Sequence, residues 1–88
     1  MPWIVRISRT AEKQIERLDR QAQRRIVDFL RERVAGAADP RLTGKPLRGH
    51  KAGLWRYRVG DYRLICRIED QELVVMVLQV GHRKEIYQ

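Results

Sequence analysis

Residues 54–65 have the sequence Leu54-Trp55-Arg56-Tyr57-Arg58-Val59-Gly60-Asp61-Tyr62-Arg63-Leu64-Ile65. Aromatic or apolar residues alternate with arginines on both sides of Gly60-Asp61. This period of two is typical of β-strands, and a Gly-Asp pair suits a two-residue hairpin turn. The sequence therefore predicts a hairpin in which three pairs lie opposite each other: Val59 and Tyr62, Arg58 and Arg63, and Tyr57 and Leu64.

The same alternation sorts the hairpin side chains between two faces. Trp55, Tyr57 and Val59 are expected on one face. The residues interpreted as core are Trp55, Tyr57, Tyr62 and Leu64. Three arginines share the other face: Arg56, Arg58 and Arg63. Like charges directly opposite each other destabilise a sheet, so the cluster predicts a bound anion. RNA phosphate is the anion that the rest of the sequence favours.

Length and charge limit the class of protein. The 88 residues predict a single domain, 1–88, and carry 19 Lys and Arg against 11 Asp and Glu, a net charge of +8. A small basic domain favours a nucleic acid or an acidic protein partner. The lone Cys66 fits a reducing compartment and is expected in the core. With neither a leader pattern nor a long apolar run, a cytoplasmic location without membrane contact is expected.

Two helices are predicted before the hairpin. Ser8 is a candidate N-cap for a helix that begins near Ala11, and Asp19 is expected to end that helix and cap the next. The second helix is expected to stop near Gly36. A short strand is predicted over 2–7, a long loop over 35–53, and further strands over 54–59, 62–69 and 73–80, the last as the buried central strand.

This β-α-α-β-β-β order predicts an α+β fold. The two helices are expected to form a hairpin packed on one face of a small, twisted, mostly antiparallel sheet. Glu69, Asp70 and Glu72 fall at the predicted turn before the last strand and are interpreted as solvated turn residues.

Several kinds of chemistry are disfavoured by the residues present. His50 and His82 are far apart in sequence, and there is no clustered set of metal ligands, so no metal is expected. Phosphate-binding glycine loops and dinucleotide fingerprints are also absent, so no cofactor is expected. Arginine, tyrosine and histidine remain, and they suit cleavage of RNA at its own 2′-hydroxyl. That reaction needs a base, stabilisation of the phosphorane charge and an acid for the leaving oxygen.

The chain resembles the RelE branch of the RelE/ParE toxin superfamily. The resemblance covers essentially the whole chain and is carried by Leu47-Arg48-Gly49, the hairpin 54–65, Val80-Gly81-His82-Arg83 and Tyr87. It implies the toxin of a type II toxin–antitoxin pair, which enters the ribosomal A site and cuts mRNA without a metal. It also implies a cognate acidic, RelB-like antitoxin held in a hetero-oligomeric complex.

The resemblance assigns roles residue by residue. The phosphate-binding arginine of the family falls on Arg63, the leaving-group arginine on Arg83, and the base-stacking tyrosine on Tyr87. Arg48 falls on the arginine of the Leu-Arg-Gly loop. Arg56 and Arg58 stand where the best-known members carry lysines. Because arginine is a poor general base, the base is Arg58, His82, the environment of the 2′-hydroxyl, or a group of the ribosome.

Alternative interpretations stay open for these residues. Arg56 and Arg58 can form the solvated face of an edge strand, Arg63 can pair with an acid, Tyr87 can pack on the sheet, and His82 can be a hydrogen-bonded rim residue. Two other functions also compete with the nuclease. One is a ParE-type toxin that inhibits DNA gyrase, and the other is an inactive module that binds nucleic acid.

Overall fold

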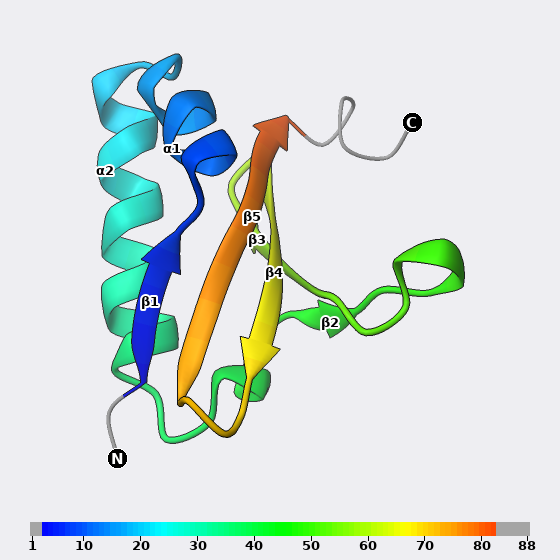
Figure 1. Ribbon diagram of the computed structural model, residues 1–88. Coiled ribbons are helices and arrows are strands. Elements are labelled where there is room, and N and C mark those ends of the chain that lie inside the picture. The colour runs from blue at the N-terminus through cyan, green and yellow to red at the C-terminus, as the bar shows by residue number, and fades with distance from the viewer. Residues whose placement is uncertain (1–2, 83–88) are drawn as a thin grey trace.

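A computed structural model describes residues 3–82 and shows two helices on one side of a five-stranded sheet (Figure 1). The elements in chain order are β1 (Ile4–Ile7), α1 (Arg9–Glu16), α2 (Arg20–Phe29), the π-helical η1 (Leu30–Ala35), the 3-10 turn η2 (Pro40–Leu42), β2 (Lys45–Pro46), the 3-10 turn η3 (Gly49–Lys51), β3 (Trp55–Val59), β4 (Tyr62–Glu69) and β5 (Val74–His82). The predicted α+β fold and element order are confirmed, with one short strand, β2, added.

Both predicted helix caps are present. The Ser8 hydroxyl accepts a hydrogen bond from the Ala11 N–H at 3.1 Å, and the Asp19 carboxylate accepts one from the Ala22 N–H at 2.7 Å. These side chains satisfy donors that a helix leaves without partners in its first turn. The second helix continues through η1 and ends at Gly36, where the sequence predicts it to end.

The strands lie in the order β1-β5-β4-β3-β2, with β1 parallel to β5 and every other pair antiparallel. Because β2 extends the sheet beyond β3, the central position belongs to β4. The prediction that the last strand is central is therefore wrong, although β5 is an interior strand. Residues 63–66 of β4 are all buried, so both faces of β4 are covered at the centre of the sheet.

The hairpin has the predicted register. Val59 lies opposite Tyr62, Arg58 opposite Arg63 and Tyr57 opposite Leu64. Gly60 in the turn has φ +59°, a conformation that favours glycine.

The core lies between the helices and one face of the sheet, which is called the helix-facing side below. It contains Ile26 and Val34 from the helices and Tyr57, Leu64 and Cys66 from the strands, all 0% exposed. The Tyr57 hydroxyl donates a hydrogen bond to the Pro40 carbonyl at 2.6 Å, which fixes the loop after η1 against β3. Burial raises the pKa of the Cys66 thiol to about 12, as expected for a core cysteine.

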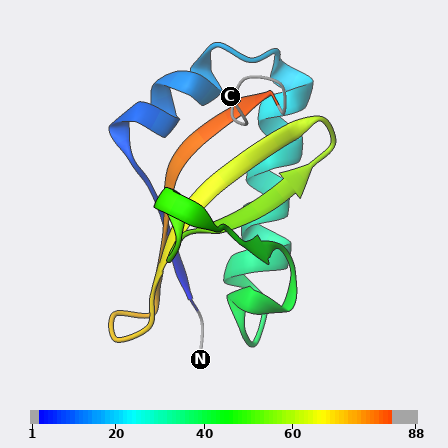
Figure 2. The same ribbon diagram turned by 90° about the vertical axis from the view of Figure 1, so that its right-hand side faces the viewer.

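Residues 45–54 form an arm that extends from the sheet on the side away from the helices (Figure 1). The arm carries β2 and η3, and Figure 2 shows it in front of the opposite face of the sheet, the outer side. The sequence predicts only a loop here, because two paired residues are too few to produce a recognisable alternation.

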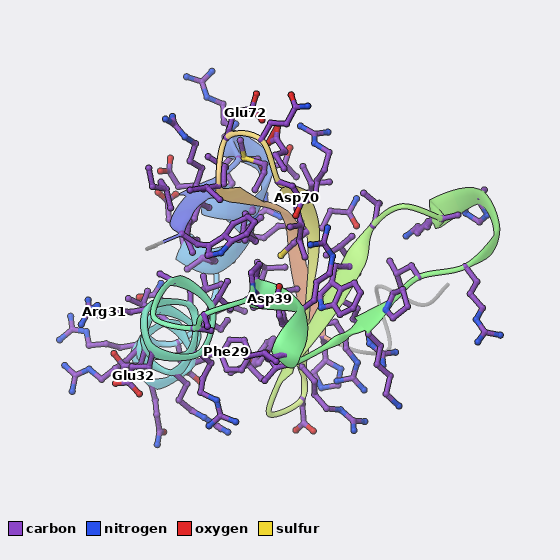
Figure 3. The ribbon with its side chains drawn as sticks, turned by 90° about the horizontal axis from the view of Figure 1, so that it is seen from below. Phe29, Arg31, Glu32, Asp39, Asp70 and Glu72 are labelled. Atoms are coloured by element: carbon purple, nitrogen blue, oxygen red, sulfur yellow. The ribbon has the colours of Figure 1, made fainter. Side chains whose placement is uncertain are left out.

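The loop before the arm is tied to the β4–β5 turn by an ion pair. Two guanidinium nitrogens of Arg41 donate hydrogen bonds to the two carboxylate oxygens of Asp70, at 2.8 and 2.9 Å. Asp70 is labelled in this turn in Figure 3. It is exposed, as predicted, but its partnership with Arg41 is not visible in the sequence. Within residues 3–82, no helix has the length and apolar character needed to cross a membrane.

Candidate nucleic-acid interface

The outer side of the sheet carries a group of cations, which is called the basic face below. It consists of Lys45 on β2, Arg56 and Arg58 on β3, and Arg63 on β4. Lys45 lies directly opposite Arg56, and Arg58 lies directly opposite Arg63. These side chains share one side because their neighbours Tyr57 and Leu64 point into the core on the other. The predicted arginine cluster is therefore present, with one further cation.

The pairing of like charges is unfavourable in the protein alone. Cations directly opposite each other on adjacent strands repel, which costs a few tenths to about 1 kcal/mol per pair. The basic face contains two such pairs side by side. A bound polyanion would offset this repulsion, because each phosphate can bind two neighbouring cations at once.

Arg63 occupies the centre of the sheet and is only 4% exposed. The hairpin pattern groups Arg63 with Arg56 and Arg58 on an anion-binding face, which implies a surface side chain, and the burial of Arg63 shows that this interpretation is wrong. Arg63 lies between Arg58 on one neighbouring strand and Gly81 on the other. Gly81 contributes no side chain beside Arg63 and is itself buried. One guanidinium nitrogen lies 3.5 Å from the Tyr62 carbonyl oxygen, so part of the group is held against the strand.

A β-bulge places Gly81 beside Arg63. Ile65 pairs with Gln79, but the next residue, Cys66, pairs with Val77, so Leu78 is the additional residue in β5. A bulge of this kind shifts the alternation of side chains by one position. Without it, Arg63 would lie opposite the bulkier Val80 instead of Gly81.

Two side chains from the start of the fold support the bulge. The Ser8 hydroxyl donates a hydrogen bond to the Leu78 carbonyl at 3.1 Å, so Ser8 serves both the helix cap and the bulge. Gln14 of α1 accepts a hydrogen bond from the Val80 N–H at 2.6 Å. Helix α1 therefore contributes to the position of Gly81 and, through it, to the basic face.

The two β3 arginines differ in exposure. Arg58 is exposed and Arg56 is half-buried beside Lys45. The alternative that both arginines lie on a solvated edge strand holds only in part. Strand β2 pairs with the first residues of β3, including Arg56, and leaves the rest of that edge, including Arg58, without a neighbouring strand. Arg48 lies on the arm immediately before η3 and is exposed.

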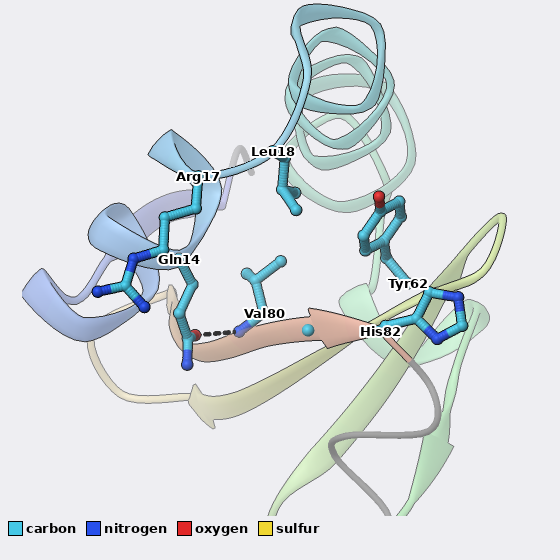
Figure 4. Close-up of a pocket in the computed structure, with 7 residues that line it drawn as sticks. Gln14, Arg17, Leu18, Tyr62, Val80 and His82 are labelled. Carbon is cyan, nitrogen blue, oxygen red and sulfur yellow. Dashed lines mark hydrogen bonds between the residues drawn. The ribbon is translucent and has the colours of Figure 1, made fainter.

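His82 lies on the other side of the sheet from the arginines. It pairs with Tyr62, and the two rings meet edge to face with centroids 6.0 Å apart. Together with Gln14 and Leu18 they line a hollow of about 460 Å³ at the end of β5 (Figure 4). The structure therefore does not bring His82 together with Arg58 and Arg63. The bulge is the reason, since it turns His82 to the helix-facing side.

Two of the predicted site residues, Arg83 and Tyr87, lie outside the described residues. Their assignment stays a prediction. Within the described part of the chain, no three His, Cys, Asp or Glu residues are placed to hold a metal ion.

Lys45 is the member of the basic face that the sequence pattern does not predict. It stands between Gly44 and Pro46 in a segment without periodicity. Proline is tolerated in an edge strand, so Lys45-Pro46 close to the predicted hairpin is the one sequence feature that is consistent with an edge strand here.

Comparison with known families places the whole fold in one group. A family model described as the ParE toxin of the type II toxin–antitoxin system parDE matches residues 5–87. Toxin RelG of Mycobacterium tuberculosis is 37% identical over 87 residues, which cover 99% of this chain and 98% of that protein. Toxin RelE of the same organism is 31% identical over 86 residues, covering 98% of this chain and 87% of that protein.

Solved structures show the same architecture. The toxin–antitoxin complex RelBE2 of M. tuberculosis contains a chain that superposes with a TM-score of 0.86 at 35% identity, covering 94% of this chain and 93% of that one. A chain of the archaeal RelE–RelB complex of Pyrococcus horikoshii gives 0.75 at 28% identity, with 94% and 97% covered. A mutant of the Escherichia coli toxin RelE in the free state gives 0.78 at 25% identity, with 99% and 92% covered.

Proposed function

The chain belongs to the RelE/ParE superfamily of type II toxin–antitoxin toxins, and we propose that it is an endoribonuclease that arrests translation by cutting mRNA in the ribosomal A site. The observation that carries this proposal is the basic face, where Lys45 opposes Arg56 and Arg58 opposes Arg63. Similarity to toxins named RelG and RelE supports the nuclease branch of the superfamily.

The proposed reaction uses the RNA as its own nucleophile. The 2′-oxygen loses its proton to a base and attacks the adjacent phosphorus, and the bond from phosphorus to the 5′-oxygen breaks. The products are a 2′,3′-cyclic phosphate and a 5′-hydroxyl that has gained a proton. No metal is required by this chemistry. The protein must hold the phosphate and stabilise the negative charge that develops on its oxygens.

Arg63 is proposed to stabilise that charge. Its central, largely buried position restricts its side chain, and preorganised cations are the effective ones. Arg56, Arg58 and Arg48 are proposed to hold the phosphates of the strand. Arg83 as the acid for the 5′-oxygen and Tyr87 as the base-stacking ring remain part of the proposal through the family resemblance.

Neither Arg58 nor His82 is well placed to act as the base. Arg58 is exposed, and an ordinary guanidinium keeps its proton far above neutral pH. The imidazole of His82 points from the opposite side of the sheet. We therefore propose that a group of the ribosome accepts the proton of the 2′-hydroxyl. RNA that is not bound to a ribosome should then be cleaved much more slowly.

A cognate antitoxin is the proposed protein partner. Chains that resemble this one occur in complexes named RelBE2 and RelE–RelB. With a net charge of +8, this chain favours an acidic, RelB-like protein through charge complementarity. We propose that the antitoxin covers the basic face or displaces the segment from Arg83 to Tyr87, which keeps the toxin inactive.

Inhibition of DNA gyrase is the second candidate, because the matching family model is that of the ParE toxin. Induced expression in cells separates the two. The nuclease predicts growth arrest with new mRNA 5′ ends inside translated codons, detected by primer extension. Arrest with intact mRNA and cleaved DNA trapped on gyrase would instead establish the gyrase activity.

A further inference from the structure

A cleft of about 270 Å³ lies at the open edge of β3, beside the basic face. It separates the end of the long helix from the segment that leads into β2. Its lining includes Phe29, Arg33, Gly44, Lys45, Arg56 and Arg58. The last three belong to the basic face as well, so the cleft and the face form one continuous cationic surface that passes around the edge of the sheet. We call it the edge cleft.

The helix contributes cations on both sides of Phe29. Arg25, Phe29 and Arg33 are spaced four residues apart and so lie on the same side of the helix. A Cβ placed on Gly60 would lie 3.0 Å from a guanidinium nitrogen of Arg25, so Arg25 lies against the hairpin turn. Among the residues that line the edge cleft, none is Asp or Glu.

One wall of the edge cleft is fixed before any ligand binds. The indole N–H of Trp55 donates a hydrogen bond to the Thr43 carbonyl at 2.8 Å. Gly44 has φ +84°, and a Cβ there would overlap the Trp55 indole nitrogen and the Arg56 carbonyl oxygen. The backbone at Gly44 therefore packs tightly against β3 and fixes the position of Lys45. Because this wall is already ordered in the free protein, less conformational entropy is lost when a ligand binds.

We propose that the edge cleft binds a backbone phosphate of the same single RNA strand that lies on the basic face, next to the nucleotides that are cleaved. The inference rests on the proposed function, which supplies the strand. A guanidinium group binds phosphate through two parallel hydrogen bonds. Arg33 and Arg58 each bring a guanidinium group to the lining of the same cleft. A strand with a charge on every nucleotide fits the continuous path better than an isolated anion does.

The test measures binding of the purified toxin to single-stranded RNA whose 2′-hydroxyls are methylated, which prevents cleavage. Arg33→Ala is compared with Arg31→Ala. Arg31 is an exposed arginine of the same helix that points away from the sheet, whereas Phe29 points toward it (Figure 3). Arg31 lines a different hollow, together with Arg24 and Asp28.

Arg33→Ala is expected to weaken binding about tenfold at low salt, the effect of one charged hydrogen bond. It should also reduce the slope of log affinity against log salt by about 0.7, the value for one phosphate contact on a single strand. Arg31→Ala should change neither quantity. Extending the RNA by a few nucleotides should increase the affinity of the wild type more than that of Arg33→Ala.

Two results would overturn the inference. One is equal RNA binding by Arg33→Ala and Arg31→Ala while the wild type cleaves mRNA in cells, which would leave the nuclease intact without the edge cleft. The other is unchanged RNA binding by Arg33→Ala with weakened binding of the antitoxin, which would make the cleft a protein-binding site. RNA binding that depends on Arg33 in a toxin that cleaves no mRNA would support the cleft and contradict the nuclease.

Discussion

Arg58 and Arg63 lie directly opposite each other on adjacent strands but differ in their surroundings. Arg63 is at the centre of the sheet and nearly inaccessible, whereas Arg58, directly opposite, is exposed. We expect Arg63 to act through a fixed position and Arg58 to act mainly through its charge. Substitutions at the two sites should therefore have different consequences.

Arg58→Ala is expected to stabilise the fold and weaken RNA binding. It removes repulsion between directly opposite cations, so the free energy of unfolding should rise by a few tenths of a kcal/mol in low salt. The gain should shrink in high salt, where charges are screened. Urea unfolding at two salt concentrations measures this, and the slope of RNA affinity against salt should fall by about 0.7. A loss of stability at low salt would show that Arg58 makes favourable contacts.

The elements differ in how well the sequence predicts them. Ser8 and Asp19 cap their helices as expected, because a cap depends only on residues nearby in the chain. The register of the β3–β4 hairpin also follows from the Gly60-Asp61 turn. Local interactions determine each of these features, and the sequence pattern records local interactions directly.

Features that depend on distant partners were predicted less well. Lys45 joins the basic face only because β2 pairs with β3, and the burial of Arg63 requires strands on both sides of β4. The side of the sheet that His82 faces depends on the bulge at Leu78. The sequence predicts a last strand that ends at Val80 and gives no indication of the bulge, so it does not assign His82 to either side of the sheet.

Gly44→Ala should destabilise the protein by at least about 2 kcal/mol. The new methyl group would overlap the Trp55 indole and the Arg56 carbonyl, and the positive φ adds strain for any residue with a Cβ. Gly53→Ala is the matched control, since it has φ +94° but nothing within 4 Å of the added Cβ. It should cost about 1 kcal/mol through the strain of a Cβ at positive φ alone. Equal losses in thermal or urea unfolding would show that the contact at Gly44 is not tight.

On the scale of the whole molecule, Arg41 and Asp70 join the loop before the arm to the turn between β4 and β5. The hydrogen bonds from Arg41 are the main reason that the pKa of Asp70 is lowered from its ordinary value of 3.8. A carboxylate with a lowered pKa stabilises the fold above its unfolded pKa, and this contribution is lost as the pH falls through the folded pKa.

Asp70→Asn should therefore be less stable than the wild type at neutral pH and equal to it in strong acid. The difference should be small because both groups are exposed. Chemical unfolding of both proteins across the acid range gives the difference as a function of pH. A difference that persists unchanged below the folded pKa would mean that the amide disturbs the turn for a reason other than lost charge.

We propose that Arg63 on the basic face stabilises the charge that develops on the cleaved phosphate, and a comparison of Arg63→Ala with Arg67→Ala tests this role. Both arginines lie on the outer side of β4, but Arg67 pairs with Met76, away from Arg58. The measurement is the rate of mRNA cleavage on programmed ribosomes, with thermal unfolding of each variant, because Arg63 is buried. Arg63→Ala should lower the rate roughly 100- to 1000-fold, and Arg67→Ala should leave it unchanged. A folded Arg63→Ala variant that cleaves as fast as Arg67→Ala would contradict the claim.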